Sequence, residues 1–464
     1  MKLYNTLTRQ KDVLKPLNDK TVKVYTCGLT VYSHPQIGNW VAYIYSDVLH
    51  RALLAEGYQV NRVQNITDVG HLVSDDDGGE DKMEKGARAE GTTAWEVADK
   101  YIKICDEEAY TQLKLLRPNK LIRATSLIEE QINFVKVLEE MGYTYVIEDG
   151  VYFDTSKLDD YGKLAQLNIE GLEAGARVEI GGKKRLTDFA LWKFSPKDKK
   201  RDMEWESPWG KGFPGWHLEC SVIARENLGD QIDIHTGGID HIPVHHTNEI
   251  AQTESLTGKK PFSQFWFHNN FIKVNGEKLG KSLKNSYLLG DIIKKGYSLH
   301  AFKLLVLSSH YRTEGNFTWE ILEAAQNRLN RWQAIADLRW QVETEKPQIE
   351  EVDMAWGAIL SPLEDDLNTP LALNHAESSL EQFTKAFPSW GKQDMDKLLD
   401  FIDKLLGINL AKPDISNVQK KLIIDRDVAR AAKDWAKSDE LRDQLKESGI
   451  EVKDTDNGSI WSRA

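Results

Sequence analysis

Residues 21–67 are "TVKVYTCGLTVYSHPQIGNWVAYIYSDVLHRALLAEGYQVNRVQNIT", and this stretch decides the fold. β-Branched residues alternate in 21–26, which predicts a strand, and 58–67 has the pattern of a second one. Between them, apolar residues recur at helical spacing over 40–54, with Asn39 as the expected N-cap. Two strands joined by a helix predict a parallel sheet, in which ligands bind at the carboxyl ends of the strands.

Length and composition limit the class of protein. The chain has 464 residues, too many for one hydrophobic core, so we expect several domains. Its 60 basic and 72 acidic residues give a formal charge of −12, which argues against non-specific coating of nucleic acid. The sequence has no apolar run of membrane-spanning length and no secretory signal, and its three cysteines fit a reducing compartment. We expect a cytoplasmic monomer without membrane association.

The secondary-structure pattern that the sequence predicts changes along the chain. A strand-rich section broken by glycines, about 143–209, interrupts the α/β pattern, and strand signals resume at 231–238 and 264–282. After about Glu314, helical periodicity predicts a helix bundle, and the tail predicts two helices followed by two strands. We expect an α/β fold: a Rossmann-type parallel-sheet domain with an inserted subdomain, an α-helical bundle and a small mixed α/β C-terminal module. The expected boundaries are 1–314, with the insertion at about 115–209, then 315–408 and 418–464.

Four residues form a candidate metal-binding set. His245 and Glu249 are four positions apart, so on a helix their side chains lie on one face. Thiolates of Cys27, which follows the first strand, and Cys220 would complete a set suited to Zn²⁺. The spacing leaves an alternative open, because such a His/Glu pair is often a surface helix pair and an isolated cysteine is often a core residue. We expect Cys105 to be such a structural cysteine.

Eight short motifs occur in order along the chain: "YTCGLTVY", "NITD", "GWHLECS", "DIHTGG", "HHTNEIAQ", "KLGKS", "DDLNTP" and "KDWAKSDELRDQL". Together they resemble the cysteinyl-tRNA synthetases, a family of class I aminoacyl-tRNA synthetases, over essentially the full chain. The resemblance implies a ligase of protein biosynthesis that forms cysteinyl-adenylate from L-cysteine and ATP, with Mg²⁺, and transfers cysteine to the 3′ end of tRNA(Cys). It also implies one zinc ion per chain, bound by Cys27, Cys220, His245 and Glu249. Zinc would select cysteine because it binds a thiolate better than a protonated hydroxyl.

Two family motifs bind the phosphates of ATP: a His-Ile-Gly-His motif at a helix N-terminus and a Lys-Met-Ser-Lys-Ser loop. In this chain Gln36-Ile37-Gly38-Asn39 replaces the first, so two neutral amides stand where the family has histidines. The second is present as "KLGKS", with both lysines. The resemblance implies catalytic roles for Gln36, Gly38, Asn39, Lys278 and Lys281. We expect the amides to donate hydrogen bonds to phosphate, with His34 as the alternative donor.

The resemblance assigns three further groups of residues. ATP would contact Gly38, Gly237, Gly238, Asp240 and Lys281. Cysteine would contact Cys27, Thr67, Trp216 and His235. The anticodon would contact Arg430, Trp435 and Asp439, which offer a cation, a stacking ring and a carboxylate. Two alternatives remain: an inactive, zinc-stabilised tRNA-binding paralogue, suggested by the missing histidines, and a mycothiol-type ligase that joins cysteine to an amino sugar and lacks such a tail.

Overall fold

The structure is a computed structural model. It describes residues 1–70, 81–167, 182–196, 200–280, 285–342, 351–455 and 458–463. The chain forms two compact units. The first comprises Met1–Lys273, Glu277–Leu289 and Tyr311–Gly315, and the second comprises Val274–Gly276, Gly290–His310 and Asn316–Ala464. Of the helices in the described ranges, none has both the length and the apolar character that crossing a membrane requires.

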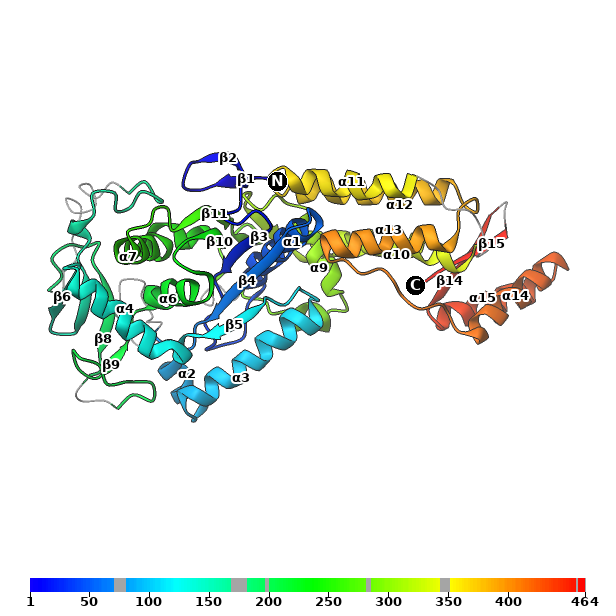
Figure 1. The fold of residues 1–464 in the computed structure, drawn as a ribbon. Coiled ribbons are helices and arrows are strands. Elements are labelled where there is room, and N and C mark those ends of the chain that lie inside the picture. Colours follow the sequence, from blue (N-terminus) through cyan, green and yellow to red (C-terminus); the bar gives the residue numbers. More distant parts are fainter. Residues whose placement is uncertain are drawn as a thin grey trace. The chain divides into compact units, whose positions relative to one another are not determined.

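The first unit is built on a five-stranded parallel sheet with the order β11-β10-β3-β4-β5 (Figure 1). Its strands are β3 (Thr21–Thr26), β4 (Gln59–Ile66), β5 (Lys120–Arg123), β10 (Ile232–Gly238) and β11 (Ser263–Asn269). The two strands predicted within 21–67 are confirmed, and they pair in parallel from Thr21 opposite Gln59 to Thr26 opposite Gln64. Strand β5 lies within the range expected to be an insertion, but it is an edge strand of this sheet.

The strand order reverses at β3. The chain passes from β3 through β4 to β5 on one side, and β10 and β11 lie on the other side of β3. In open parallel sheets the ligand crevice forms at such a switch point, outside the carboxyl ends of the strands. Cys27 directly follows β3, and its backbone N–H donates to Thr236 O of β10 at 3.2 Å. The sequence segments around Cys27 and Gly238 therefore meet at the switch point.

Two helices that lie far apart in the sequence both contact the central sheet. Helix α1 (Ile37–Ala55) contacts β4, β10 and β11, and α6 (Trp216–Leu228) contacts β4 and α7 (Thr247–Thr257). Apolar side chains of α6 share one buried cluster with Tyr25, Val63 and Trp266 of the sheet. Burying one large apolar side chain contributes about 1.5–3 kcal/mol, so this cluster fixes α6, which carries Cys220, against the strands.

The remaining elements of the first unit surround this layer. Three more helices are α2 (Lys82–Glu90), α3 (Ala94–Asp106) and α4 (Ile128–Glu140). The strand-rich section of the sequence forms a four-stranded antiparallel sheet of β6 (Thr144–Ile147), β7 (Gly150–Phe153), β8 (Phe189–Phe194) and β9 (Gly212–Pro214). A hairpin of β1 (Lys2–Asn5) and β2 (Gln10–Val13) begins the chain. Three short elements lie where the chain passes between the units: β12 (Ile272–Val274), α8 (Leu289–Lys294) and β13 (Gly315–Phe317).

The second unit is mainly helical, as its sequence predicts. Its first helices are α9 (Leu299–Leu307), α10 (Trp319–Asp337), α11 (Glu351–Glu364), α12 (Thr369–Lys385) and α13 (Lys392–Leu406). The tail follows with α14 (Asn417–Ala431), α15 (Trp435–Glu447), β14 (Ile450–Thr455) and β15 (Gly458–Arg463), the two strands forming an antiparallel pair. Within this unit β15 contacts α10, and Trp461 N donates to Gln341 Oε1 at 2.8 Å.

Candidate active site

A cavity of about 820 Å³ opens at the switch point of the first unit. Eleven of the predicted site residues line it: Cys27, Gln36, Gly38, Asn39, Thr67, Trp216, Cys220, Gly238, Asp240, His245 and Lys278. Glu249, His235 and Gly237 lie behind the wall and are not among its lining residues. Lys281 lies outside the described residues. The fold thus brings Cys27 and Lys278, 251 positions apart in the sequence, to one cavity, which has room for a nucleotide and an amino acid.

The predicted metal-binding side chains meet at one end of the cavity. One ligand atom from each of Cys27, Cys220, His245 and Glu249 lies within 4.8 Å of the other three. His245 lies in a π-helical turn, Ile242–His246, that continues directly into α7, so the helix places His245 Nε2 3.1 Å from Glu249 Oε1. The same-face arrangement that the four-residue spacing predicts is therefore present.

The charges in this cluster fit a cation. Burial opposes ionisation of Cys27, but hydrogen bonding with Cys220 and the neighbouring histidines outweigh it and hold the pKa of the Cys27 thiol well below its ordinary value. Burial and the adjacent Cys27 raise the pKa of Cys220 well above its ordinary value. Burial lowers the pKa of His245, but Glu249 and Cys27 prevail and raise it to about 10. His245 thus lies between Cys27 and Glu249, and a set of two sulfurs, one imidazole nitrogen and a carboxylate suits Zn²⁺.

Two further histidines lie behind the shared ligands. Cys27, His235, His246 and Glu249 also bring one ligand atom each within 4.8 Å of one another. His235 Nε2 lies 2.9 Å from Glu249 Oε2, and His246 Nε2 lies 3.3 Å from Cys27 Sγ. Neither histidine lines the cavity, whereas Cys220 and His245 do. The set that includes Cys220 and His245 is therefore the one that a ligand in the cavity reaches.

Helix α1 begins three residues earlier than the sequence predicts. Gln36, not Asn39, occupies the N-cap position, and Asn39 is the third residue of the helix. The expected N-cap is wrong because the Asn39 side chain bonds to the residue three positions before it: its Oδ1 accepts from Gln36 N at 2.8 Å. This contact uses the carbonyl of the Asn39 amide and leaves its NH₂ group as a donor at the cavity wall. His34 also lines the cavity, and its ring packs edge-on against Tyr101 with centroids 5.4 Å apart.

The described part of the "KLGKS" loop is anchored beside this helix. Asn285, which is buried, accepts from Gly280 N at 2.9 Å and donates to Lys278 O at 3.1 Å. Leu279 lies so close to Gly38 that a Cβ on Gly38 would be 2.8 Å from Leu279 Cδ1. A side chain at this position would require Leu279 to shift, so glycine allows the closest approach of the loop to α1. The loop therefore places Lys278 at the same cavity as the start of α1.

The cavity also contains residues that the sequence analysis missed. Glu219 lines it, accepts from the Thr67 hydroxyl, and lies 3.3 Å from the Asn65 Nδ2 donor. Burial raises the pKa of Glu219 to about 8. Trp216 packs against His245 with the ring centroids 4.5 Å apart and the rings tilted by 32°. The signal in the sequence was the position of Glu219 directly before Cys220 in "GWHLECS"; its burial is seen only in the structure.

The glycines of β10 have a steric reason. A Cβ on Gly237 would lie 2.5 Å from a ring carbon of His246, and one on Gly238 would lie 2.3 Å from Asp240 Oδ1. Both side chains would displace groups around the cavity.

The residues predicted for the anticodon lie in the second unit: Arg430 at the end of α14, and Trp435 and Asp439 in α15. Trp435 is 55% exposed, and the Arg430 guanidinium lies 5.6 Å from its ring centroid.

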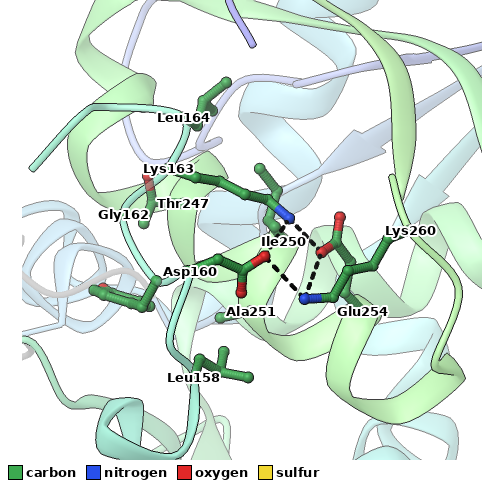
Figure 2. Close-up of a pocket in the computed structure, with 11 residues that line it drawn as sticks. Leu158, Asp160, Gly162, Lys163, Leu164, Thr247, Ile250, Ala251, Glu254 and Lys260 are labelled. Carbon is green, nitrogen blue, oxygen red and sulfur yellow. Dashed lines mark hydrogen bonds and ion pairs between the residues drawn. The ribbon is translucent and has the colours of Figure 1, made fainter.

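A second, much smaller hollow in the first unit is filled by an ion-pair cluster (Figure 2). Lys163 lies 2.6 Å from Glu254 and 3.0 Å from Asp160, and Lys260 lies 2.8 Å from Asp160. The hollow measures about 10 Å³, which is too small for a ligand larger than water. The cluster joins the segment around Asp160 to the C-terminal end of α7, the helix that carries Glu249.

Known protein families match both parts of the chain. A family model of the class I (C) tRNA synthetase catalytic domain matches residues 13–327, and a model of the cysteinyl-tRNA ligase anticodon binding domain matches residues 412–461. Cysteine–tRNA ligase 1 of Burkholderia lata is 42% identical over 467 residues, 98% of this chain and 95% of that protein. Cysteine–tRNA ligase of Caldicellulosiruptor saccharolyticus is 40% identical over 479 residues, 100% of both.

Solved structures share the fold at low sequence identity. Methionyl-tRNA synthetase of Mycobacterium tuberculosis, in complex with methionyl-adenylate, has a TM-score of 0.58 at 13% identity, over 84% of this chain and 92% of that one. The leucyl-tRNA synthetase in a ternary complex from Agrobacterium radiobacter K84 has a TM-score of 0.60 at 11% identity, over 85% of both chains. The class I synthetase fold and the resemblance found in the eight motifs are confirmed. Because relatives at about 40% identity match along the whole length, the chain belongs to the cysteine–tRNA ligase family.

Proposed function

We propose that this protein activates L-cysteine with ATP to give cysteinyl-adenylate and pyrophosphate, and then transfers cysteine to the 3′ end of tRNA(Cys). The observation that carries this proposal is the single cavity at the switch point. One end of it presents two cysteine sulfurs, and another part presents Lys278 and the first turn of α1. A site for a thiol amino acid and a site for phosphate are thus arranged in one space, as adenylate formation requires.

The proposed cofactor is one zinc ion held by Cys27, Cys220, His245 and Glu249. Zinc, when bound, holds the substrate sulfur as a thiolate, which a serine hydroxyl does not match near neutral pH. Hydrophobic fit separates such near-isosteres by only about a hundredfold. Trp216, packed against His245, lines the same end of the cavity, and Thr67 is oriented by its bond to Glu219. These side chains would position the amino group and carboxylate of cysteine.

The phosphate end uses neutral and charged donors together. The negative charge that grows on the α-phosphate would be stabilised by the N-terminus of α1, by the NH₂ groups of Gln36 and Asn39, and by Lys278. Lys281 is proposed for the same task from the family motif. Gly237, Gly238 and Asp240 are proposed to contact the adenosine, and Mg²⁺ would accompany ATP. His235 is proposed to support the cysteine site through Glu249, since it lies behind the cavity wall.

The tail is proposed to bind the anticodon through Arg430, Trp435 and Asp439. Trp435 offers an exposed ring for stacking, and Arg430 offers a cation beside it. The proposed domains are a catalytic domain at 1–314, a helix bundle at 315–408 and an anticodon-binding module at 418–464. The proposed location is the cytoplasm. The match of an anticodon-domain model to 412–461 favours tRNA over an amino sugar as the acceptor.

The inactive-paralogue alternative is favoured only by the missing histidines, and one assay decides it. Wild-type protein should catalyse ATP–pyrophosphate exchange that depends on cysteine, and deletion of 410–464 should spare this exchange but greatly weaken charging of tRNA(Cys). No exchange with wild-type protein would refute the proposed activity. The zinc set is tested by metal content: Cys220→Ser should lose zinc, whereas Cys105→Ser, which changes a cysteine outside the cluster, should keep it. Equal zinc in both variants would contradict the set.

A further inference from the structure

A buried chain of polar side chains leads away from the cavity behind Cys27. His246 Nε2 lies 3.3 Å from Cys27 Sγ, and His246 Nδ1 lies 2.7 Å from His268 Nε2. His268 Nδ1 lies 2.7 Å from Thr6 Oγ1. His246, His268 and Thr6 are 0%, 4% and 3% exposed. They come from the turn before α7, from β11 and from the segment after β1, so only the folded chain assembles them.

A cysteine that binds zinc does so as the thiolate, so in the proposed metal site Cys27 carries no proton. With both histidines neutral, the hydrogen bonds then allow one arrangement of protons, in which His246 Nε2 donates to Cys27 Sγ. A neutral imidazole has a single N–H, so His246 Nδ1 accepts, and His268 Nε2 donates to it. His268 Nδ1 then accepts as well, and the Thr6 hydroxyl must be the donor. Thr6 therefore terminates the chain and fixes the tautomer of both rings.

We propose that Thr6, acting through His268 and His246, is a positioning residue that orients the Cys27 thiolate for zinc. The inference rests on the zinc site of the proposed function. Outer partners that hold one tautomer pre-orient a metal ligand, and their loss typically lowers metal affinity by about 10- to 100-fold. Glu249 Oε2 has a separate partner in His235 Nε2 at 2.9 Å. His246 Nε2 lies 3.3 Å from Cys27 Sγ and 3.9 Å from Glu249 Oε1, so loss of the Thr6 hydroxyl would act mainly on Cys27.

The test measures the zinc dissociation constant of the full-length protein by competition with a chromophoric chelator. Thr6→Val removes the hydroxyl at nearly constant volume, and Thr6→Ser keeps it. We expect Thr6→Val to bind zinc about 10-fold or more weakly than wild type, and Thr6→Ser to stay close to wild type. Thr8→Val is the matched control, because the Thr8 hydroxyl donates to half-buried Asp12 at 2.6 Å and not to His268.

Two results would overturn the inference: unchanged zinc affinity in Thr6→Val, or equal loss in Thr6→Val and Thr6→Ser, which would assign the effect to packing. Circular dichroism of the zinc-free variants accompanies the titration. Should Thr6→Val not fold, His268→Phe replaces it, since a phenyl ring can keep the stacked contact with Trp266, whose ring centroid lies 6.3 Å away. Unchanged affinity there would likewise overturn the inference. Wild-type protein that binds no zinc would instead refute the proposed metal site.

Discussion

Asn39→Asp separates the two tasks that the structure gives to one side chain. Asn39 Oδ1 accepts from Gln36 N at 2.8 Å, and the NH₂ group of the same amide is free to bind phosphate at the cavity wall. A carboxylate keeps the acceptor but has no proton to donate. The first turn of α1 contains no acidic residue, so an anion there should stabilise the helix by about 0.3–1 kcal/mol.

The effect on activation should have the opposite sign. Loss of one well-placed donor to a developing anion costs about 3–4 kcal/mol, a factor of about 10²–10³ in rate, and the new carboxylate adds repulsion toward ATP. Asn39→Ala should lose the donor too, but it also loses the cap contact, which costs about 0.5–2 kcal/mol of stability. We therefore expect both variants to be slow, with Asn39→Asp at least as stable as wild type and Asn39→Ala less stable.

The assay is cysteine-dependent ATP–pyrophosphate exchange, with a thermal melt of each variant. The KM for cysteine should stay near the wild-type value, because the sulfur end of the cavity is unchanged. Gln419→Glu is the control: Gln419 holds the same helix position in α14, where its Oε1 accepts from Ser416 N at 2.9 Å, in the second unit. Undiminished exchange in Asn39→Asp would refute our account of this motif.

Three other predictions follow from the contacts. His34→Ala should slow pyrophosphate exchange by less than about 10-fold if the amides serve the phosphate, and a loss of the size expected for Asn39 would make His34 the donor. Arg426, whose side chain is fully buried, binds Asp454 at 2.8 and 2.9 Å and, through these bonds, holds the pKa of that carboxyl at about 2. Asp454→Asn should therefore impair tRNA charging more than pyrophosphate exchange. The Arg426–Asp454 ion pair should persist above pH 4 and weaken between about pH 4 and 2, which limited proteolysis of the tail can follow. Loss of the ion pair only above pH 4 would contradict the predicted direction of the pH dependence. Lys163→Ala should lower the free energy of unfolding by about 1–3 kcal/mol, and Lys260→Ala, whose side chain is 51% exposed, by under about 1 kcal/mol, in thermal melts (Figure 2); the reverse order would contradict the burial argument.

Local patterns in the sequence predicted the elements well. The alternation in 21–26 gave the bounds of β3 correctly, because strand propensity and burial act there together. The start of α1 was misplaced by three residues, because Asn39 is both a good N-cap type and a good acceptor for the residue three positions earlier. Strand β5 was missed, since four residues with little alternation carry almost no local signal.

Residues of the site could be predicted from the sequence only where the residue type itself indicates the chemistry. Cys27, Cys220, His245 and Glu249 could be proposed together because few side chains bind zinc. His246, the same residue type as its neighbour His245, could not be distinguished by sequence. Its role depends on His268, 22 positions away, and through His268 on Thr6, 240 positions away. Such long-range partners become visible only when the sheet brings β11 and the N-terminal segment together.

The most direct test of the account replaces zinc by cobalt in the wild-type protein and records the sulfur-to-cobalt absorption band while an amino acid is added. Free L-cysteine should shift and intensify this band as a further sulfur joins the metal set, and L-serine at the same concentration should leave it unchanged. Equal responses to cysteine and serine, or a protein that takes up cobalt without any thiolate band, would contradict the claim that Cys27, Cys220, His245 and Glu249 select the substrate through a metal.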